Sequence, residues 1–219
     1  MRRILSTLLL LLVITGCGPR YVDYFPYHDD GTPKPRIALI SVVDSSGYKL
    51  PWNLSREFTQ EIKDELVGNG DVYLLSQREM DVDLTKLGTI DFFNKEISWA
   101  KCFCDADYAV ALEFIEHNVI PYDQMTEDSL CTDKCARHSA VLSMKMRVKI
   151  INTRMPSCPQ VVLHEILTCN QVIPWQRNLV DYETNCWGSE NFFATPLGMA
   201  HQRLITDISC RIRETVELR

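Results

Sequence analysis

The sequence lacks the short motifs that mark the common hydrolases, nucleotide-binding proteins and metalloproteases. Gly-x-Ser-x-Gly, the P-loop and His-Glu-x-x-His are all absent. The five histidines are scattered, and none lies in a catalytic motif: His28, His117, His138, His164 and His201. Catalytic groups drawn from distant positions leave no such trace, so a site built by the fold stays open. The sequence nevertheless predicts a protein that is not an enzyme, and it contains no pattern for a cofactor.

Positive charge is scarce and unclustered. The chain has 23 Lys and Arg against 29 Asp and Glu, a formal net charge of −6 at pH 7. A protein that binds nucleic acid presents a concentrated basic face, because phosphate contacts supply much of its affinity. We therefore expect no nucleic-acid partner.

Long apolar runs are also missing, and the longest one lies at the start of the chain. It extends from Ile4 to Ile14 behind Arg2 and Arg3, which is shorter than the about 20 residues that a spanning helix needs. A basic start, a short apolar segment and then small residues are typical of a signal peptide. We predict that residues 1–16 are such a peptide and that cleavage follows Gly16.

The residues around that cleavage point, Ile14-Thr15-Gly16-Cys17, resemble the bacterial lipobox. The resemblance implies a diacylglyceryl group on the Cys17 thiol and a fatty acid such as palmitate on the freed amine. More than one acyl chain gives stable anchoring in a membrane. Gly18, in place of aspartate, implies an outer-membrane lipoprotein whose domain faces the periplasm or, alternatively, the cell surface. The competing interpretation is an ordinary secretory signal followed by an incidental cysteine.

Eight further cysteines remain in the mature chain, an even number. In an oxidising compartment they predict up to four disulfides: the candidates are Cys102, Cys104, Cys131, Cys135, Cys158, Cys169, Cys186 and Cys210. Zinc binding by the pairs Cys102/Cys104 and Cys131/Cys135 with His138 is an alternative, but the usual Cys-x2-Cys spacing is missing. A thiol-exchange centre at Cys102 and Cys104 is another, although Asp105 and Asp107 beside it disfavour a thiolate. An unpaired cysteine could also join the protein covalently to a crosslinked envelope.

Residues 17–35 are predicted to be a lipidated tether rich in proline and tyrosine, which keeps helix and sheet from propagating. A single periplasmic domain, residues 36–219, would follow it. In its first part we expect a buried strand over Arg36–Val43, a helix capped by Asn53 or Ser55 and ending near Val67, a short strand at Val72–Leu75, a helix over Asp91–Ala100 and a strand over Tyr108–Ile115.

The second part carries the clearest pattern in the chain. From Leu142 to Ile150 apolar residues alternate with Ser143, Lys145, Arg147 and Lys149, which predicts an antiparallel strand with one apolar and one basic, wetted face. Val161–Ile173 should pair with it as a hairpin. Two long cysteine-bearing loops, at 121–137 and 174–193, and a helix from Thr195 complete the domain. We expect the four tryptophans to be core or interface anchors: Trp52, Trp99, Trp175 and Trp187.

This element order, with Arg36-Ile-Ala-Leu-Ile-Ser-Val-Val-Asp44 and Val72-Tyr-Leu-Leu-Ser-Gln-Arg78, resembles a periplasmic α/β module. The module is shared by curli-secretion lipoproteins, lipoprotein activators of penicillin-binding proteins and the amino-terminal domain of the Tol translocation protein. The whole chain is similar to an uncharacterised lipoprotein family of chlamydiae. The resemblance implies an α/β (α+β) fold: a single mixed sheet with helices packed on it, in the order β-α-β-α-β-β-β-α, with disulfide-braced loops.

A rigid α/β scaffold with two long cysteine-braced loops and no catalytic motif predicts a non-catalytic, membrane-anchored adaptor or accessory subunit for an envelope protein. The basic residues of the alternating strand argue against the lipid-facing hairpin of a pore. The alternatives are a thiol-disulfide-active envelope enzyme and a disulfide-linked component of the envelope.

Overall fold

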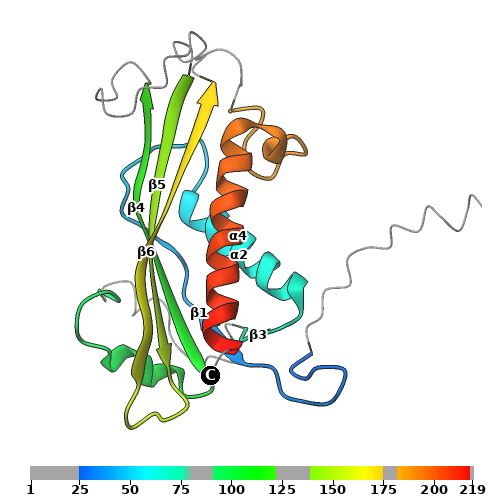
Figure 1. Cartoon of the computed structure of the whole chain (residues 1–219), viewed down its shortest axis with the longest axis vertical. Helices are drawn as coiled ribbons and strands as arrows, with labels where there is room; N and C mark the ends of the chain where they lie inside the picture. The colour runs from blue at the N-terminus through cyan, green and yellow to red at the C-terminus, as the bar shows by residue number, and fades with distance from the viewer. Residues whose placement is uncertain (1–24, 77, 79–90, 122–138, 175–181, 218–219) are drawn as a thin grey trace, which may run out of the picture.

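The computed structural model of the protein describes residues 25–76, 78, 91–121, 139–174 and 182–217. The elements, shown in Figure 1, follow in the order β1 (Arg36–Leu39), β2 (Val43–Asp44), α2 (Leu54–Asn69), β3 (Tyr73–Leu74), the 3-10 helix η1 (Ser98–Phe103), β4 (Tyr108–Pro121), β5 (Ser139–Asn152), β6 (Gln160–Pro174), the 3-10 helix η5 (Phe192–Ala194) and α4 (Pro196–Glu217).

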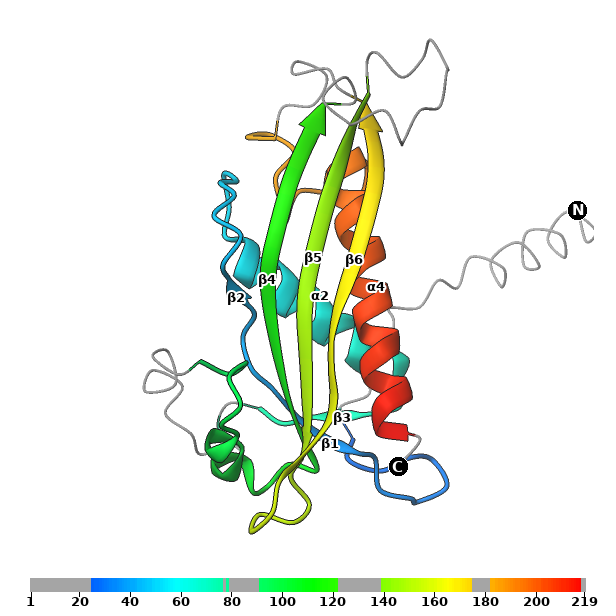
Figure 2. The same cartoon turned by 60° about the vertical axis from the view of Figure 1, so that its left-hand side comes forward.

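The strands form one mixed sheet, as predicted. Its order is β3-β1-β4-β5-β6, and β2 pairs with β4 beside β1. β1 runs parallel to β3 and β4, because α2 carries the chain back between β1 and β3. β4, β5 and β6 are antiparallel and long, and they extend well beyond the short parallel strands (Figure 2). The hairpin between β5 and β6 is confirmed.

Helices α2 and α4 lie side by side on one face of the sheet (Figure 1). α2 begins at Leu54 because the Asn53 side chain accepts a hydrogen bond from the Arg56 backbone N–H at 2.8 Å. It ends at Gly70, whose φ of 76° supplies the left-handed cap. Leu54, Phe58, Ile62 and Leu66 of α2 face the sheet and are buried. The two helices and the sheet thus enclose the main hydrophobic core.

The predicted first strand is interrupted. β1 ends at Leu39 and β2 covers only Val43–Asp44. Between them the N-terminal turn of α2 holds the chain: the Thr59 hydroxyl accepts a hydrogen bond from the Val42 N–H at 2.9 Å, and the Ser55 hydroxyl donates to the Val42 carbonyl. These side-chain bonds replace the strand ladder at this point.

The predicted helix over Asp91–Ala100 is wrong. The segment is a series of turns followed by η1. The Asp91 and Asn94 side chains accept hydrogen bonds from backbone N–H groups two residues further on, at 2.9 Å each. Such bonds offer the backbone an alternative to the helix. The segment buries Phe92, Trp99 and Phe103 against the other face of the sheet, in a second core over its lower end.

The basic face of β5 is therefore not wetted throughout. Lys145 and Arg147 are partly exposed, but Lys149 is only 2% exposed. Its ammonium group donates to the backbone carbonyls of Phe92 and Asn94 at 3.0 and 2.8 Å. Burial under the turn segment lowers the pKa of Lys149. The two hydrogen bonds to carbonyl oxygens offset the cost of burying its ammonium group.

Candidate functional site

Several residues singled out in the sequence lie outside the described part of the chain. These are the cleavage and lipidation residues Gly16 and Cys17, the loop residues Cys131, Cys135 and His138, and Trp175. Their predicted roles stay predictions. No helix in the described ranges has both the length and the hydrophobicity to cross a membrane.

The predicted disulfide bracing of the loops is absent among the described residues. All six described cysteines are free. They lie on separate elements: two on and just after η1, one in the β5–β6 turn, one on β6, one in the loop before η5 and one on α4 (Cys102, Cys104, Cys158, Cys169, Cys186 and Cys210). A disulfide needs Cα atoms within about 7 Å and converging side chains, a condition that sequence spacing cannot reveal. Packing and hydrogen bonds brace the described domain instead.

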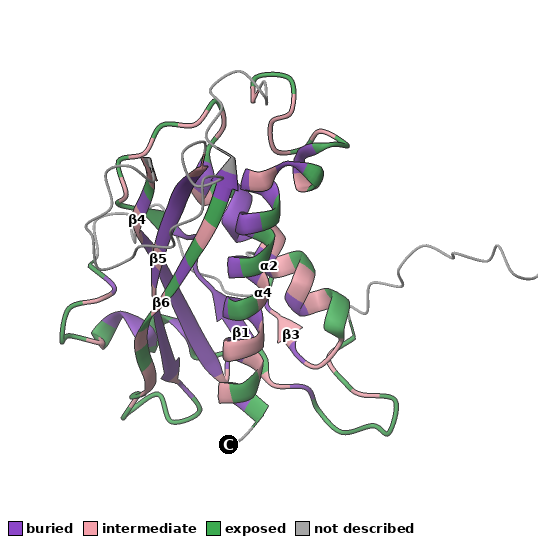
Figure 3. Cartoon of the chain, turned by 45° about the horizontal axis from the view of Figure 1, so that its top comes forward, coloured by how far each residue is buried: buried purple, intermediate pink, exposed green. Residues whose placement is uncertain are grey.

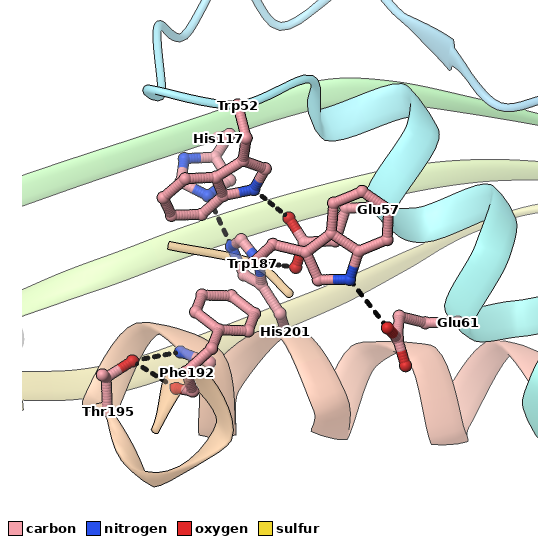
Figure 4. Close-up of polar contacts among 9 residues, drawn as sticks. Trp52, Glu57, Glu61, His117, Trp187, Phe192, Thr195 and His201 are labelled. Carbon is pink, nitrogen blue, oxygen red and sulfur yellow. Dashed lines mark hydrogen bonds and ion pairs between the residues drawn. The ribbon is translucent and has the colours of Figure 1, made fainter. Parts of the chain in front are cut away.

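The fold does bring together three ionisable side chains that the sequence keeps far apart. Glu57 of α2, His201 of α4 and His117 of β4 form a line in the core (Figure 4), and each is 0% exposed. The Glu57 carboxylate lies 2.6 Å from His201 Nδ1, and His201 Nε2 lies 2.9 Å from His117 Nε2. Trp52 Nε1 donates to the second Glu57 oxygen at 2.6 Å. We call these residues the buried relay.

The tautomers of the two histidines decide which Nε2 donates in the buried relay. In the arrangement in which His201 Nδ1–H donates to the carboxylate and His201 Nε2 carries no proton, His117 Nε2–H donates to His201 Nε2. This assignment leaves His117 Nδ1 as a buried acceptor, with no hydrogen-bond partner among the described residues. Burial, reinforced by the neighbouring His201, lowers the pKa of His117 to about 3. His117 is therefore neutral at physiological pH.

The buried relay has the parts of a proton-transfer chain, but its three ionisable side chains lie in the core. Aromatic rings enclose it: His201 packs against Phe58 and Phe192, and His117 against Tyr48 and Phe114. The surface hollows on α4, at the start of α2 and at the C-terminal end of α4 are lined by other residues. In the described residues no group of three or more His, Cys, Asp or Glu is arranged to hold a metal. The relay thus ties β4, α2 and α4 together from inside.

The described tryptophans are anchors, as predicted. Trp99 is buried in the second core. Trp187 Nε1 donates to the Glu61 carboxylate at 2.7 Å, which fastens the loop before η5 to α2 (Figure 4). Burial raises the pKa of Glu61, although the hydrogen bond from Trp187 acts to lower it. With Trp52 in the relay, indole N–H groups hold the loop before α2 and the loop before η5.

The surface that remains for contact is the sheet face opposite the helices. Above the turn segment, side chains from three strands stand in cross-strand rows, in which Glu113–Arg147–Ile166 and Glu116–Lys145–Thr168 are neighbours. Further along β6, Asn170 and Val172 point the same way. We call this surface the open face: Glu113, Glu116, Lys145, Arg147, Ile166, Thr168, Asn170 and Val172.

Charges on the open face are paired, whereas its apolar groups are exposed. Lys145 Nζ lies 2.6 Å from the Glu116 carboxylate, and Arg147 lies 3.3 Å from that of Glu113. The Lys145 ammonium, helped by the Ser143 hydroxyl, lowers the pKa of Glu116. Ile166 and Val172 are 53% and 60% exposed. Exposed and covered residues alternate along much of β6 (Figure 3), as expected for a strand with one face on a core.

Comparison with known proteins places the chain in a family. Residues 23–218 match the family of unknown function DUF7499. The chain belongs to this family. No curated protein matches it. The solved structure of the hypothetical protein CT253 from Chlamydia trachomatis is similar, with 26% identity and a TM-score of 0.62 over 85% of this chain and 99% of that chain. The predicted likeness to a chlamydial protein is confirmed at this level, and its lipoprotein character stays a prediction.

Two other solved structures are more distant. The lipoprotein GNA1162 from Neisseria meningitidis has 8% identity and a TM-score of 0.39, covering 80% of this chain and 98% of that chain. The C-terminal domain of LpoB from Salmonella enterica has 13% identity and a TM-score of 0.36, covering 64% and 85%. Likeness at this level adds nothing about the site of this DUF7499 protein.

The buried relay was missed because its residues give no local signal. His201 lies 84 residues from His117 and 144 from Glu57. The one available hint was Glu57 itself, an acidic residue next to Phe58 on the face of α2 that turns toward the core. The open face, by contrast, follows from the alternation of β5 that the sequence displays.

Proposed function

We propose that this DUF7499 protein is a non-catalytic adaptor, anchored to the outer membrane by lipid on Cys17, that binds a protein partner through the open face. The observation that carries the proposal is the contrast between the two faces of the long strands. One face is sealed by α2 and α4, while the other presents Ile166 and Val172 to solvent. Exposed apolar side chains beside fixed ion pairs give this face the mixed polar and apolar character of protein contact surfaces.

The state of the ionisable groups supports a binding role over a catalytic one. The buried relay is enclosed by aromatic rings, and the open-face carboxylates are held in ion pairs. A general acid or base must reach its substrate within hydrogen-bond distance. Neither set of groups meets that requirement in the described residues, whereas a rigid sheet with fixed charges suits recognition.

Photo-crosslinking in the native cells tests the adaptor role. A photoreactive residue at Thr168 of the open face is expected to capture a reproducible protein neighbour. The matched control carries the same residue at Gln60, an exposed position on α2, and should not capture that neighbour. Recovery of lipid alone from both positions would contradict the proposal.

The anchor is tested separately with Cys17→Ser. We expect the variant to escape lipid modification and to leave the membrane fraction, because the lipid is attached through the missing thiol. Mass spectrometry of the mature amino terminus reports the modification directly. A variant that is processed and retained like the parent would remove the anchor from the proposal.

A thiol-active enzyme is the second candidate, and one observation favours it. Cys102 and Cys104 are both exposed and free. Reaction with a thiol reagent over a pH range decides between the two functions: a thiol enzyme would show a reactive thiolate near neutral pH, whereas the adaptor is expected to show two ordinary thiols. The same measurement on a Cys102→Ser, Cys104→Ser variant gives the background.

A further inference from the structure

β6 is an edge strand with little of the protection that such strands usually carry. It runs over Gln160–Pro174 and pairs with β5, and no described strand pairs with its outer side. It has no Lys or Arg, and its only proline is the last residue. Its single charged side chain, Glu165, is bound by Arg211 at 2.7 Å. Edge strands normally carry lysine, proline or bulges because a free row of backbone groups invites another strand.

One bulge is present, but it lies near the base of the strand. The register shifts between Ile150 and Ile151 of β5, which pair with Leu163 and Val161 and leave Val162 without an opposite residue. From Leu163 to Pro174 the pairing is regular. This stretch offers an uninterrupted row of backbone donors and acceptors on its outer side.

Helix α4 runs along this edge. Arg203 reaches Gln171 of β6 at 3.4 Å, and Arg211 reaches Glu165. Between these contacts, the outward surface of α4 has a shallow hollow lined by Met199, Gln202, Arg203, Thr206 and Asp207. An edge strand flanked by a helix is the arrangement into which extended peptides insert in other peptide-binding domains.

We propose that an extended segment of the protein partner adds to β6 as a further strand of the sheet. This inference rests on the proposed adaptor function and specifies how the partner binds. Successive side chains of an added strand point to opposite faces. One set would lie beside Ile166 and Val172 on the open face and be apolar. The other set would face the α4 hollow and be polar, with an acidic group toward Arg203 and a basic group toward Asp207.

The position of α4 decides between a lone strand and a second copy of the chain. α4 contacts β6 more extensively than it contacts β5, so its axis lies toward β6. Paired strands lie about 4.8 Å apart, and two-fold pairing through β6 would bring the two α4 helices to a similar separation. Packed helices need about 8–10 Å between axes. A single strand without such a helix fits, and a second copy does not.

Register mapping by photo-crosslinking in the full-length protein tests strand addition. The photoreactive residue is placed in turn at Ile166, Thr168 and Asn170, successive positions on one face of β6. An added strand is expected to give crosslinks within one partner peptide, in which the attachment point moves by about two residues for each two-residue step along β6.

The second measurement is the crosslink yield after lysines are introduced on the edge strand β6. Ile166→Lys with Val172→Lys is expected to lower the crosslink yield at Thr168 about tenfold or more, since edge lysines block strand pairing. The control is Val161→Lys, a 44% exposed position on the same strand before the bulge, which should leave the yield unchanged. All three positions are exposed, so thermal melting is expected to stay at the parent value.

Three outcomes would overturn the inference, and they differ in what else they affect. Crosslinks from β6 that scatter over the partner without a register step would leave the adaptor function standing but exclude strand addition. Crosslinks to β6 of a second copy would show self-association in place of a partner segment. Absence of any protein crosslink from β6 and from Lys145 on the neighbouring strand would remove the adaptor function as well.

Discussion

The two faces of the long strands differ in what their charged groups do. On the helical face, Glu57, His117 and His201 are fully buried, and each is hydrogen-bonded to another member of the relay. On the open face, Lys145 and Arg147 form partly exposed ion pairs. Buried polar networks are costly when broken, whereas exposed ion pairs contribute little to stability. The comparison teaches that the charged groups of the helical face hold the fold, whereas those of the open face contribute little to its stability.

The largest effect is expected from Glu57→Ala. The substitution leaves the Trp52 indole N–H and His201 Nδ1–H without their acceptor inside the core. Each buried donor left without an acceptor costs about 1–3 kcal/mol, and this substitution leaves two. Urea unfolding followed by far-ultraviolet circular dichroism measures the loss. Asp64→Ala, at an exposed position on the same helix, should change stability by less than about 0.5 kcal/mol, and an equal loss in the two variants would contradict the contrast between the faces.

A pH dependence follows from His117. Its pKa is about 3 in the folded protein and 6.5 as the ordinary value, so between these pH values the unfolded chain binds a proton that the folded protein does not. The contribution of His117 to the free energy of unfolding is therefore fully present above pH 6.5. It falls by about 1.4 kcal/mol per pH unit as the pH drops toward 3. Urea unfolding at a series of pH values measures the slope. His117→Gln should flatten it, and a slope as steep as that of the parent would contradict the assignment to His117.

Close packing on the helical face is tested by Gly198→Ala. A Cβ atom at Gly198 of α4 would lie 2.1 Å from the Phe192 carbonyl oxygen of η5. Because that oxygen belongs to the backbone, α4 and η5 must move apart, at a cost of about 1–3 kcal/mol. In the matched change Gly68→Ala on α2, the new methyl group meets no atom within 4 Å, and higher helix propensity should stabilise the protein by up to about 1 kcal/mol. Thermal unfolding shows whether each substitution raises or lowers stability. A Gly198→Ala variant more stable than the parent would show that the contact between α4 and η5 is not tight.

The sequence predicted those elements whose signals are local. The alternation of β5 and the Asn53 cap of α2 depend on neighbouring residues, and both are confirmed. Lys149 could not be placed, because its acceptors Phe92 and Asn94 lie 57 and 55 residues away. The helix predicted from Asp91 failed because side-chain bonds to nearby N–H groups outweighed a modest apolar pattern.

The number of cysteines, like the positions of the histidines in the sequence, does not reveal which side chains meet in the fold. An even count in an exported chain predicts disulfides on average, but bonding depends on which side chains the fold brings within reach. In the described residues, Cys169 is buried on β6 while Cys158 is exposed in the turn before that strand. The buried relay shows the converse, since residues with no sequence relationship meet in the core. The unformed disulfides and the unpredicted relay therefore have the same cause, because both depend on contacts between residues far apart in the sequence.

The smallest effect is expected from Lys145→Ala on the open face. The Lys145 side chain is 40% exposed, and an exposed ion pair contributes about 0.5 kcal/mol, less at high salt. The substitution should nevertheless raise the pKa of Glu116 toward its ordinary value, because the main group that lowers it is gone. NMR titration of Glu116 follows the pKa while urea unfolding follows stability. A shift of the pKa without a loss of stability would show that the open-face charges fix a pattern for binding, and a loss as large as that of Glu57→Ala would show that both faces hold the fold.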